Sequence, residues 1–421
     1  MVTRIRNLDN LARLVPIIVI FLIFYNGYLI AQDEQVKEHN ILEYSYSGSS
    51  DLGSEFIKTM RYPEVQQLLL EIAESPRSAG YITEALKGID ITLSDLLNLQ
   101  LIRQKENLFE LSFVLYTRED MDMIRSVAEE MGKLLAEGIL EERTRIEEII
   151  KSDLPSSVDW HETALFVIGC VSLDWDGLSI STEKGFLTQP RNGEYIPQAI
   201  QPGGGGSKRA LYWGSHNYHS EIAITSFGDH YSVRQALPDI NWRMKVDAPE
   251  PLNESLIEAA RGLIRLGVGR IMIALREEDL SIQDLSKKVE LPRAEVERLV
   301  ILLEDLHYLV EEDGKYRAII TVLTDRDRKQ VNQLRQIGKE VILNWFDKHY
   351  SDLNQKLAEL NYVKYEMPLS EGFYWIWHYI FGIANRELVE AGLFADPYDQ
   401  NRQFQGSIPA VYLFDVVTDQ L

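Results

Sequence analysis

The second half of the chain changes its apolar spacing from that of helices to that of strands. Apolar side chains recur every three or four residues in three successive segments, and the turn Leu291-Pro292-Arg293 separates the second from the third. Ser281 precedes the second segment, where a helix cap is expected. The predicted helices cover residues 257–275, 282–289 and 296–306, and the predicted strands cover residues 308–310 and 315–323 around a turn with Gly314. The pattern predicts three helices followed by a β-hairpin.

The same succession occurs a second time nearer the amino terminus. Phe109-Glu110-Leu111 corresponds in type to Tyr316-Arg317-Ala318, and Thr117 corresponds to Thr324, which places the two copies about 207 positions apart. The predicted helices of this first copy cover residues 65–73, 82–88 and 93–102. A repeat of this kind predicts an internal duplication.

Three helices and a β-hairpin form the winged helix-turn-helix pattern, and residues 256–324 resemble the ArsR- and MarR-type transcriptional regulators. The resemblance rests on the helix with Asp284-Leu285-Ser286-Lys287-Lys288, the proline turn and the wing with Gly314-Lys315-Tyr316. It implies that the third helix would read the major groove of DNA and that Lys and Arg would contact phosphates. The residues that would do so are Arg293, Arg298 and Lys315.

Each copy continues into a long helical pattern and then into an apolar, aromatic segment. The long helices are expected at residues 120–151 and 327–360, with Gly132-Lys133 in the first matching Gly338-Lys339 in the second. The apolar segments, residues 160–178 and 370–393, both end in Gly-Leu. In the families resembled, the helix after the wing pairs two subunits. We therefore expect the two long helices to pair within one chain as a pseudo-dimer.

Charge argues against nucleic acid as a partner. The chain of 421 residues has 43 Lys and Arg against 65 Asp and Glu, a formal charge of -22, which repels polyanions. Residues 89–102 of the first copy contain no Lys or Arg. In the second copy, Glu295 and Glu297 offset Arg293 and Arg298, and residues 311–313 of the wing tip are all acidic. These surfaces favour a protein or ligand contact over DNA.

The amino terminus has the features of an export signal. Three arginines, Arg4, Arg6 and Arg13, precede an apolar run that extends over residues 14–31. Ala31-Gln32 resembles a cleavage site, so a cleaved signal peptide is favoured over a membrane anchor. Either outcome places the body outside the cytoplasm, and a cytoplasmic location is the alternative. Cys170 is the only cysteine, so no intramolecular disulfide forms.

Residues 179–250, between the copies, are rich in Gly, His and aromatic residues and are expected to form a small β-rich insert. The Gly-rich stretch 201–207 lacks the residue order of a nucleotide-binding loop. The side chains of His216, His219 and His230, with Asp229 or Glu221, could converge on a zinc ion, although their spacing matches no standard metal motif. The alternative is that these histidines bond to backbone carbonyls in turns.

Two further possibilities concern chemistry and ligands. A hydrolase would pair Ser215 or Ser226 with one of these histidines, but no nucleophile elbow is present in the sequence. The aromatic run 373–381 is apolar on all sides and predicts a buried helix. A pocket for a small hydrophobic ligand, between this helix and the segment near Trp160, is the alternative.

The sequence therefore predicts an α+β, mainly α protein with two winged-helix units, long helices and a small β-rich insert. We expect a non-enzymatic interaction or sensing protein without a cofactor; the alternatives are a DNA-binding regulator and then a metal-dependent enzyme. The expected divisions are a signal or anchor at 1–32, a linker at 33–54, the first unit at 55–178, the insert at 179–250, the second unit at 251–395 and a tail at 396–421.

Overall fold

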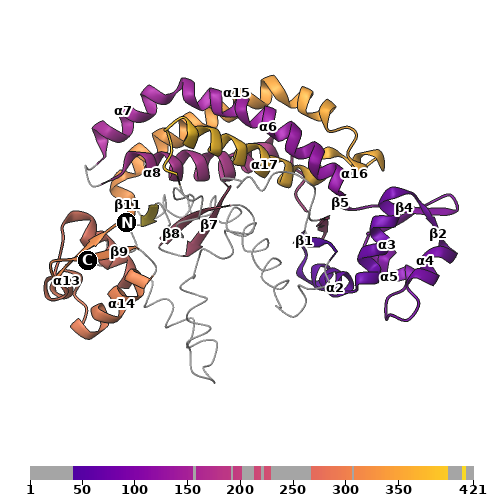
Figure 1. Cartoon of the computed structure of the whole chain (residues 1–421), viewed down its shortest axis with the longest axis horizontal. Coiled ribbons are helices and arrows are strands. Elements are labelled where there is room, and N and C mark those ends of the chain that lie inside the picture. Colours follow the sequence, from indigo (N-terminus) through magenta and orange to yellow (C-terminus); the bar gives the residue numbers. More distant parts are fainter. Residues whose placement is uncertain are drawn as a thin grey trace, which may run out of the picture. The chain divides into compact units, whose positions relative to one another are not determined.

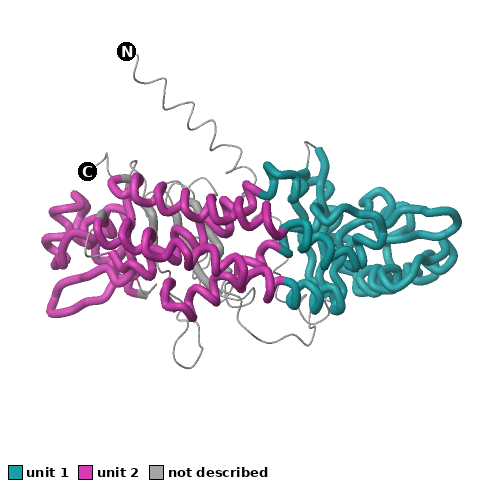
Figure 2. Tube along the Cα trace, turned by 90° about the horizontal axis from the view of Figure 1, so that it is seen from above, with its two compact units in different colours: residues 1–127, 181–207, 350–376 teal, residues 128–180, 208–349, 377–421 magenta. Residues whose placement is uncertain are grey.

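The computed structural model describes residues 41–154, 158–190, 193–201, 213–219, 222–228, 267–305, 308–396 and 410–413. These residues form an α+β fold that is mainly helical, with small sheets, as the sequence predicts (Figure 1). The chain divides into two compact units, coloured in Figure 2. Unit 1 comprises residues 1–127, 181–207 and 350–376, and unit 2 comprises residues 128–180, 208–349 and 377–421.

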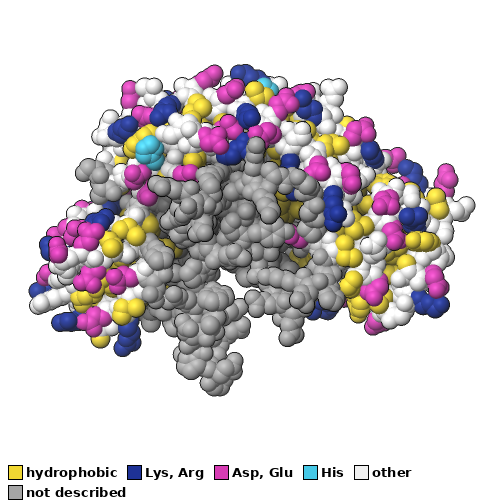
Figure 3. Space-filling model, in the orientation of Figure 1, with side chains coloured by type: hydrophobic (Ala, Val, Ile, Leu, Met, Phe, Trp, Pro, Cys, Tyr) yellow, Lys and Arg dark blue, Asp and Glu magenta, His cyan; other side chains and the backbone are white. Residues whose placement is uncertain are grey.

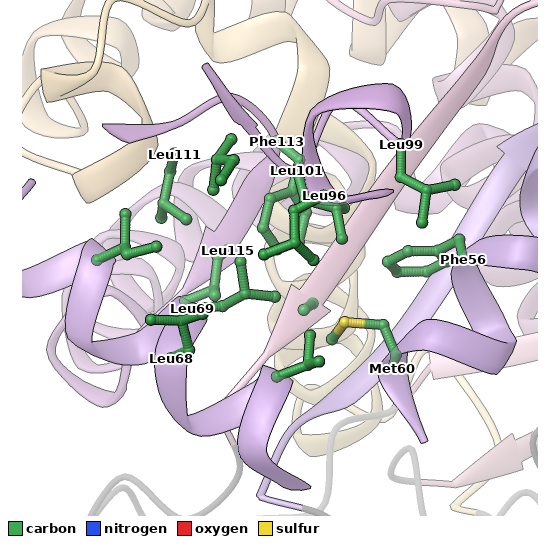
Figure 4. Packing of buried hydrophobic residues seen from close by; sticks show 14 of the residues in the cluster. Phe56, Met60, Leu68, Leu69, Leu96, Leu99, Leu101, Leu111, Phe113 and Leu115 are labelled. Carbon is green, nitrogen blue, oxygen red and sulfur yellow. The ribbon is translucent and has the colours of Figure 1, made fainter. Parts of the chain in front are cut away.

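The first winged helix lies in unit 1. Its elements are α3 (Pro63–Glu74), β2 (Arg77–Ser78), α4 (Ala79–Ala85), α5 (Leu93–Asn98), β3 (Ile102–Lys105) and β4 (Leu108–Leu111). Thr92 and Asp95 form a capping box that starts α5, and Pro63 occupies the first turn of α3, where its missing N–H costs nothing. Figure 4 shows its core, in which Leu68 and Leu69 of α3 face Leu96, Leu101 and Leu111. The third helix was predicted to reach residue 102, but α5 ends at Asn98 and Ile102 opens a strand.

The second winged helix lies in unit 2 and repeats this order. Residues 267–277 are helical, and α13 (Ile282–Val289), α14 (Arg293–Asp305), β9 (Leu309–Glu312) and β10 (Lys315–Ala318) follow. The side chain of Ser281 accepts a hydrogen bond from the Asp284 N–H, as the side chain of Ser78 does from the Tyr81 N–H in the first copy. The predicted strand 315–323 is divided into β10 and β11 (Thr321–Thr324).

The two wings pair in the same register. In the first wing Ile102 lies opposite Leu111 and Lys105 lies opposite Leu108. Adding 207 to these numbers gives the pairs of the second wing, in which residue 309 lies opposite 318 and residue 312 opposite 315. A one-residue slip would turn every side chain to the other face, so the two wings present equivalent positions to the same face.

A three-stranded pattern accompanies each winged helix. In unit 1, β6 (Tyr195–Ile200) pairs antiparallel with β1 (Glu43–Gly48) and parallel with β5 (Val114–Tyr116). In unit 2, β12 (Ala410–Leu413) pairs antiparallel with β8 (Ile222–Gly228) and parallel with β11, while β7 (Trp213–His219) extends this sheet. The β-rich region between the copies thus supplies β6 to one sheet and β7 and β8 to the other. The expected linker and tail also contribute strands, β1 and β12.

The long helices begin at equivalent caps. Asp120 accepts a hydrogen bond from the Thr117 N–H at 2.9 Å, and Asp327 accepts one from the Thr324 N–H at 2.8 Å. The first expected helix is broken at Glu142 into α6 (Arg118–Glu141) and α7 (Arg143–Asp153), whereas α15 (Arg328–Lys356) is continuous. The remaining helices are α2 (Ser50–Met60), α8 (Trp160–Ala164), η2 (Leu165–Asp176), α9 (Gly177–Glu183), α16 (Asn361–Lys364) and α17 (Leu369–Glu390).

The apolar segments form buried helices in which η2 has π-helical hydrogen bonding. Residues Trp160–Glu183 form one helix long and apolar enough to cross a membrane, but 89% of its most apolar window is buried inside the protein. Trp377 of α17 is fully buried, and its indole N–H donates to the Leu173 carbonyl of η2 at 2.7 Å. Both helices are therefore part of the core, and for residues 373–381 of α17 this burial was predicted. The apolar run 14–31, predicted to be an export signal, lies outside the described residues.

Two glycines allow the long helices to approach these apolar helices within unit 2. A Cβ atom built on Gly132 of α6 would lie 2.6 Å from the Ile380 carbonyl oxygen of α17, and one built on Gly338 of α15 would lie 2.4 Å from the Ser172 Cβ of η2. The long helix of each copy thus packs on the apolar helix of the other copy.

We expect Gly132→Ala to lower the free energy of unfolding by about 1–3 kcal/mol, because the new methyl group meets a backbone carbonyl that cannot move aside. Gly138→Ala is the control, since its Cβ would meet only the Val341 side chain, at 2.9 Å, and the gain in helix propensity opposes the strain. Urea denaturation midpoints of both variants measure the difference. Equal midpoints would contradict the close packing at Gly132.

Candidate functional site

The surface that would read DNA in the second winged helix is formed by α14 and the wing. Glu297, Ile301 and Glu304 are spaced by four and three residues on α14, so they lie on one side of that helix. Ile301 is 59% exposed, the highest exposed fraction among the large apolar residues that the structure describes. Figure 3 shows acidic, basic and apolar side chains interspersed over the lobe that contains α13, α14 and β9. The centre of this face is therefore apolar with acidic neighbours.

Carboxylates also gather around Tyr316 on β10. Tyr316 lies opposite Glu311 in the wing and packs against the core beneath it. The pKa of Tyr316 is raised, first by partial burial and then by the negative charges of Glu304, Glu311 and Glu297. The surroundings of Tyr316 are therefore acidic.

The three residues predicted to contact DNA are all exposed, but they do not form a cluster of free cations. Arg293 donates a hydrogen bond to Glu297 at 2.7 Å on the exposed surface of α14, which partly offsets its charge. Lys315 makes the smallest of the contributions that lower the pKa of the Asp284 carboxyl, after the Ser281 hydroxyl and Lys287. Arg298 is exposed beside them on α14.

The first copy offers still less to DNA. Its third helix, α5, has six residues and is about 9 Å long at 1.5 Å per residue, whereas α14 has thirteen. The first turns of α14, which contain Arg293 and Arg298, have no helical counterpart in the first copy. The position equivalent to Lys315 is Leu108, which is 44% exposed. The two would-be reading faces are therefore different in length and in charge.

The residues predicted to bind metal belong mostly to the part that is not described. His216 and His219 lie on β7, opposite Thr225 and Ile222 of β8. His230 and Asp229 lie outside the described residues, as does Glu221. Ser215 of β7 lies opposite Ser226 of β8. Within the described residues no group of three or more His, Cys, Asp or Glu side chains is placed to hold a metal ion.

A buried acid and imidazole meet between η2 and α17, which the sequence did not identify. Asp174 Oδ1 and His378 Nε2 are 3.6 Å apart, and each side chain is 4% exposed. Burial raises the pKa of Asp174 well above its ordinary value, and the thiol pKa of Cys170 is raised by burial and then by Asp174. The ring of His378 packs on Phe381 with centroids 4.9 Å apart. The pair joins two core helices without exposing a reactive atom to solvent.

Two ion pairs link the long helices to the apolar helices of unit 2, and their charges are reversed between the copies. On α6, Glu129 accepts from Arg386 of α17 at 2.7 Å. On α15, Arg335 donates to both oxygens of Asp176 of η2, at 2.7 and 3.0 Å. Glu129 and Arg335 each stand three residues before the equivalent glycines of α6 and α15. The same contact is thus made with acid and base exchanged.

A further acidic group joins β11, the strand after the second wing, to the helix that precedes η2. Glu162 of α8 accepts from the Thr321 N–H at 3.1 Å and from the Thr321 hydroxyl at 2.7 Å. Burial raises the pKa of Glu162 to about 7; the hydrogen bond from the Thr321 hydroxyl opposes this rise, and the carboxylate of Asp159 adds a smaller one. This carboxyl group therefore gains a proton near neutral pH.

Comparison with known proteins finds no family model, no curated protein and no solved structure that matches this chain. Its function has to be inferred from the residues described above.

Proposed function

We propose that this protein is a non-enzymatic interaction or sensing module, exported or held at a membrane, whose winged helices contact other proteins instead of DNA. Its two copies act as a pseudo-dimer within one chain. Export is inferred from the arginines and the apolar run of residues 1–31.

The observation that supports this proposal most directly is the exposed apolar Ile301 between Glu297 and Glu304 on α14. A helix that enters the major groove needs donors for base edges and cations for phosphates along its outer side. On α14 the middle of that side is a branched apolar side chain with no hydrogen-bonding atom. Exposure of this side chain to water costs free energy, which a contact with another protein would recover.

The asymmetry of the copies supports the same view. A dimeric regulator reads two similar half-sites, and each half-site needs the same side chains in the same place. Here Lys315 is matched by Leu108, and the helix turn with Arg293 and Arg298 is missing from the first copy. The copies have kept their packing and changed their outer surfaces, as expected if each surface meets a different partner.

We expect the purified chain to bind random DNA duplex more weakly than about 100 µM at physiological salt, the weak limit of non-specific DNA-binding proteins. Fluorescence anisotropy of a labelled duplex, repeated over a series of salt concentrations, measures this. Micromolar affinity that falls steeply with salt, and that is lost in Arg298→Glu, would instead establish the DNA-binding alternative.

The location is tested independently of any partner. Reporter fusions to the carboxyl terminus, of a kind active on one side of the membrane only, should report an extracytoplasmic body. A version in which Arg4, Arg6 and Arg13 are changed to Glu should lose that orientation, because positive charge before the apolar run sets it. A cytoplasmic signal from the unchanged chain would overturn this part of the proposal.

A further inference from the structure

The second winged helix packs on itself, whereas the first shares its core with its surroundings. In the part of the chain that the structure describes, the buried apolar cluster of the second copy draws all its members from residues 268–322. The cluster of the first copy also contains Tyr46 of β1, Phe56 of α2 and Tyr195 of β6, and Tyr365 packs against it. Within unit 2, the second winged helix is therefore the part that can move as one body.

Polar contacts hold the second winged helix to the helices of unit 2 at β11. The Thr321 hydroxyl donates to Glu162 Oε2 at 2.7 Å, and the Thr321 N–H donates to the same oxygen at 3.1 Å. The hydroxyl also accepts from the Asp159 N–H at 3.2 Å, so its own hydrogen points to Glu162. Because both bonds from Thr321 end on Oε2, Oε1 can carry a proton without loss of either bond.

The surroundings of Glu162 oppose its ionisation. Burial raises its pKa to about 7, and Asp159, which caps α8, adds to this rise. His161 stands next to Glu162 on α8, with its ring against that of Trp160. Other charged groups on the neighbouring elements pair among themselves: Lys151 and Arg143 with Glu147 on α7, Arg276 with Asp327, and Arg326 with Glu277. Above neutral pH the contact therefore holds two neighbouring carboxylates in a half-buried site.

We propose that Glu162 and Thr321 form a proton-controlled latch, which holds the second winged helix against α8 while the carboxyl is protonated and releases it when the carboxyl ionises. β11 stays paired with β12, and the buried Arg276 keeps its bond to Asp327 at 2.8 Å, so release tilts the winged helix and does not detach it. The pivot is η3 (Asp325–Asp327), the short turn that joins β11 to α15. This inference goes beyond the proposed function, because it does not depend on which partner the protein meets.

The direction of the response follows from the two states of the carboxyl group. Its pKa is about 7 when docked, and water returns the pKa toward the ordinary 4.5 when the winged helix tilts, so the docked state binds the proton more tightly between these values. Docking is therefore strongest below about pH 4.5 and weakens as the pH rises through 7. From pH 5.5 to 8 the ratio of tilted to docked molecules should rise on the order of tenfold, after allowance for partial exposure of the side chain.

The distance between two spin labels, measured by pulsed electron paramagnetic resonance, tests the latch. The full chain carries the labels at Lys287→Cys on α13 and Glu148→Cys on α7, which are both exposed, while the buried Cys170 does not react. We expect one narrow distance distribution at pH 5.5 and an added, broader component at pH 8. Glu162→Gln should keep the narrow distribution at both pH values, because the amide never ionises. Thr321→Val should give the broader component already at pH 5.5, because the hydroxyl bond is lost.

Two controls accompany this measurement. Glu371→Gln changes another half-buried glutamate and should leave the pH response as it is. Labels at Lys87→Cys and Glu359→Cys in unit 1 should report one distance at both pH values, because Tyr365 ties the first winged helix to its surroundings by donating to the Ile72 and Ala73 carbonyls of α3.

A distribution that stays the same from pH 5.5 to 8 would overturn the latch, as would a Glu162→Gln variant that responds to pH like the original chain. Either result would leave the proposed function standing, since that function is tested by DNA binding and by location.

Discussion

Changing Arg386 to Glu is expected to lower the free energy of unfolding by about 3–5 kcal/mol, the usual cost of leaving a buried charge without its partner. The Arg386 side chain is 8% exposed and donates to Glu129 at 2.7 Å and to Glu387 at 2.6 Å. The hydrogen bond from Arg386 holds the pKa of Glu129 below its ordinary value, so the pair is charged at neutral pH. The variant would place a fourth carboxylate beside those of Glu129, Glu387 and Glu390.

The double change Arg386→Glu with Glu129→Arg should recover part of the lost stability, because the ion pair is then restored with its charges exchanged. Glu129→Arg alone should cost less than Arg386→Glu, since the Glu129 side chain is 32% exposed and water screens the new charge. Urea denaturation of the four proteins gives the coupling energy. A double variant no more stable than Arg386→Glu would show that the contact matters through packing and not through charge.

The ion pair of Arg335 with Asp176 has its base on the long helix, whereas the pair of Glu129 with Arg386 has its acid there. If two first copies faced each other, Glu129 would meet Asp176, and if two second copies did so, Arg335 would meet Arg386. Like charges at a buried contact oppose association, which is a common way to select one partner over another. The exchange thus favours the pairing of unlike copies, in agreement with a pseudo-dimer formed within one chain.

Much of the fold follows from local patterns in the sequence. Helix spacing, the Ser281 cap and the Gly314 turn identify the second winged helix, and the recurrence of Thr117 as Thr324 identifies the first. The strands β1, β6 and β12 were not assigned, because each is held by hydrogen bonds to strands far away in the sequence. The break at Glu142 and the π-helical hydrogen bonding of η2 depend on packing in the same way.

The same distinction between local and long-range features applies to the candidate surfaces and the buried pairs. The acidic character of α14 and the wing could be predicted, because exposed charges on a helix and a turn can be located from spacing alone. The pairs of Asp174 with His378 and of Glu129 with Arg386 could not, since they join separate helices. One sequence signal was present: residues of opposite charge precede the equivalent Gly132 and Gly338 by three positions.

Stability should also depend on pH through Glu162, and the sign follows from the direction of its pKa shift. The pKa is about 7 in the folded protein against 4.5 for an ordinary Glu, so the folded state binds the proton more tightly between these values. The stabilisation is complete below about pH 4.5 and is lost as the pH rises through 7. The shift corresponds to roughly 2–3 kcal/mol after allowance for partial exposure of the side chain.

Glu162→Gln should remove this dependence, because the amide keeps an oxygen for the Thr321 N–H and never ionises. Its melting temperature should equal that of the unchanged protein near pH 5 and exceed it by several degrees near pH 8, where the unchanged protein has a buried carboxylate beside Asp159. Glu148→Gln on the exposed side of α7 is the control and should give a curve parallel to the original. If Glu162→Gln also runs parallel to the original from pH 5 to 8, the carboxyl that joins α8 to β11 does not titrate in this range. The link between the second wing and the core helices would then be insensitive to pH.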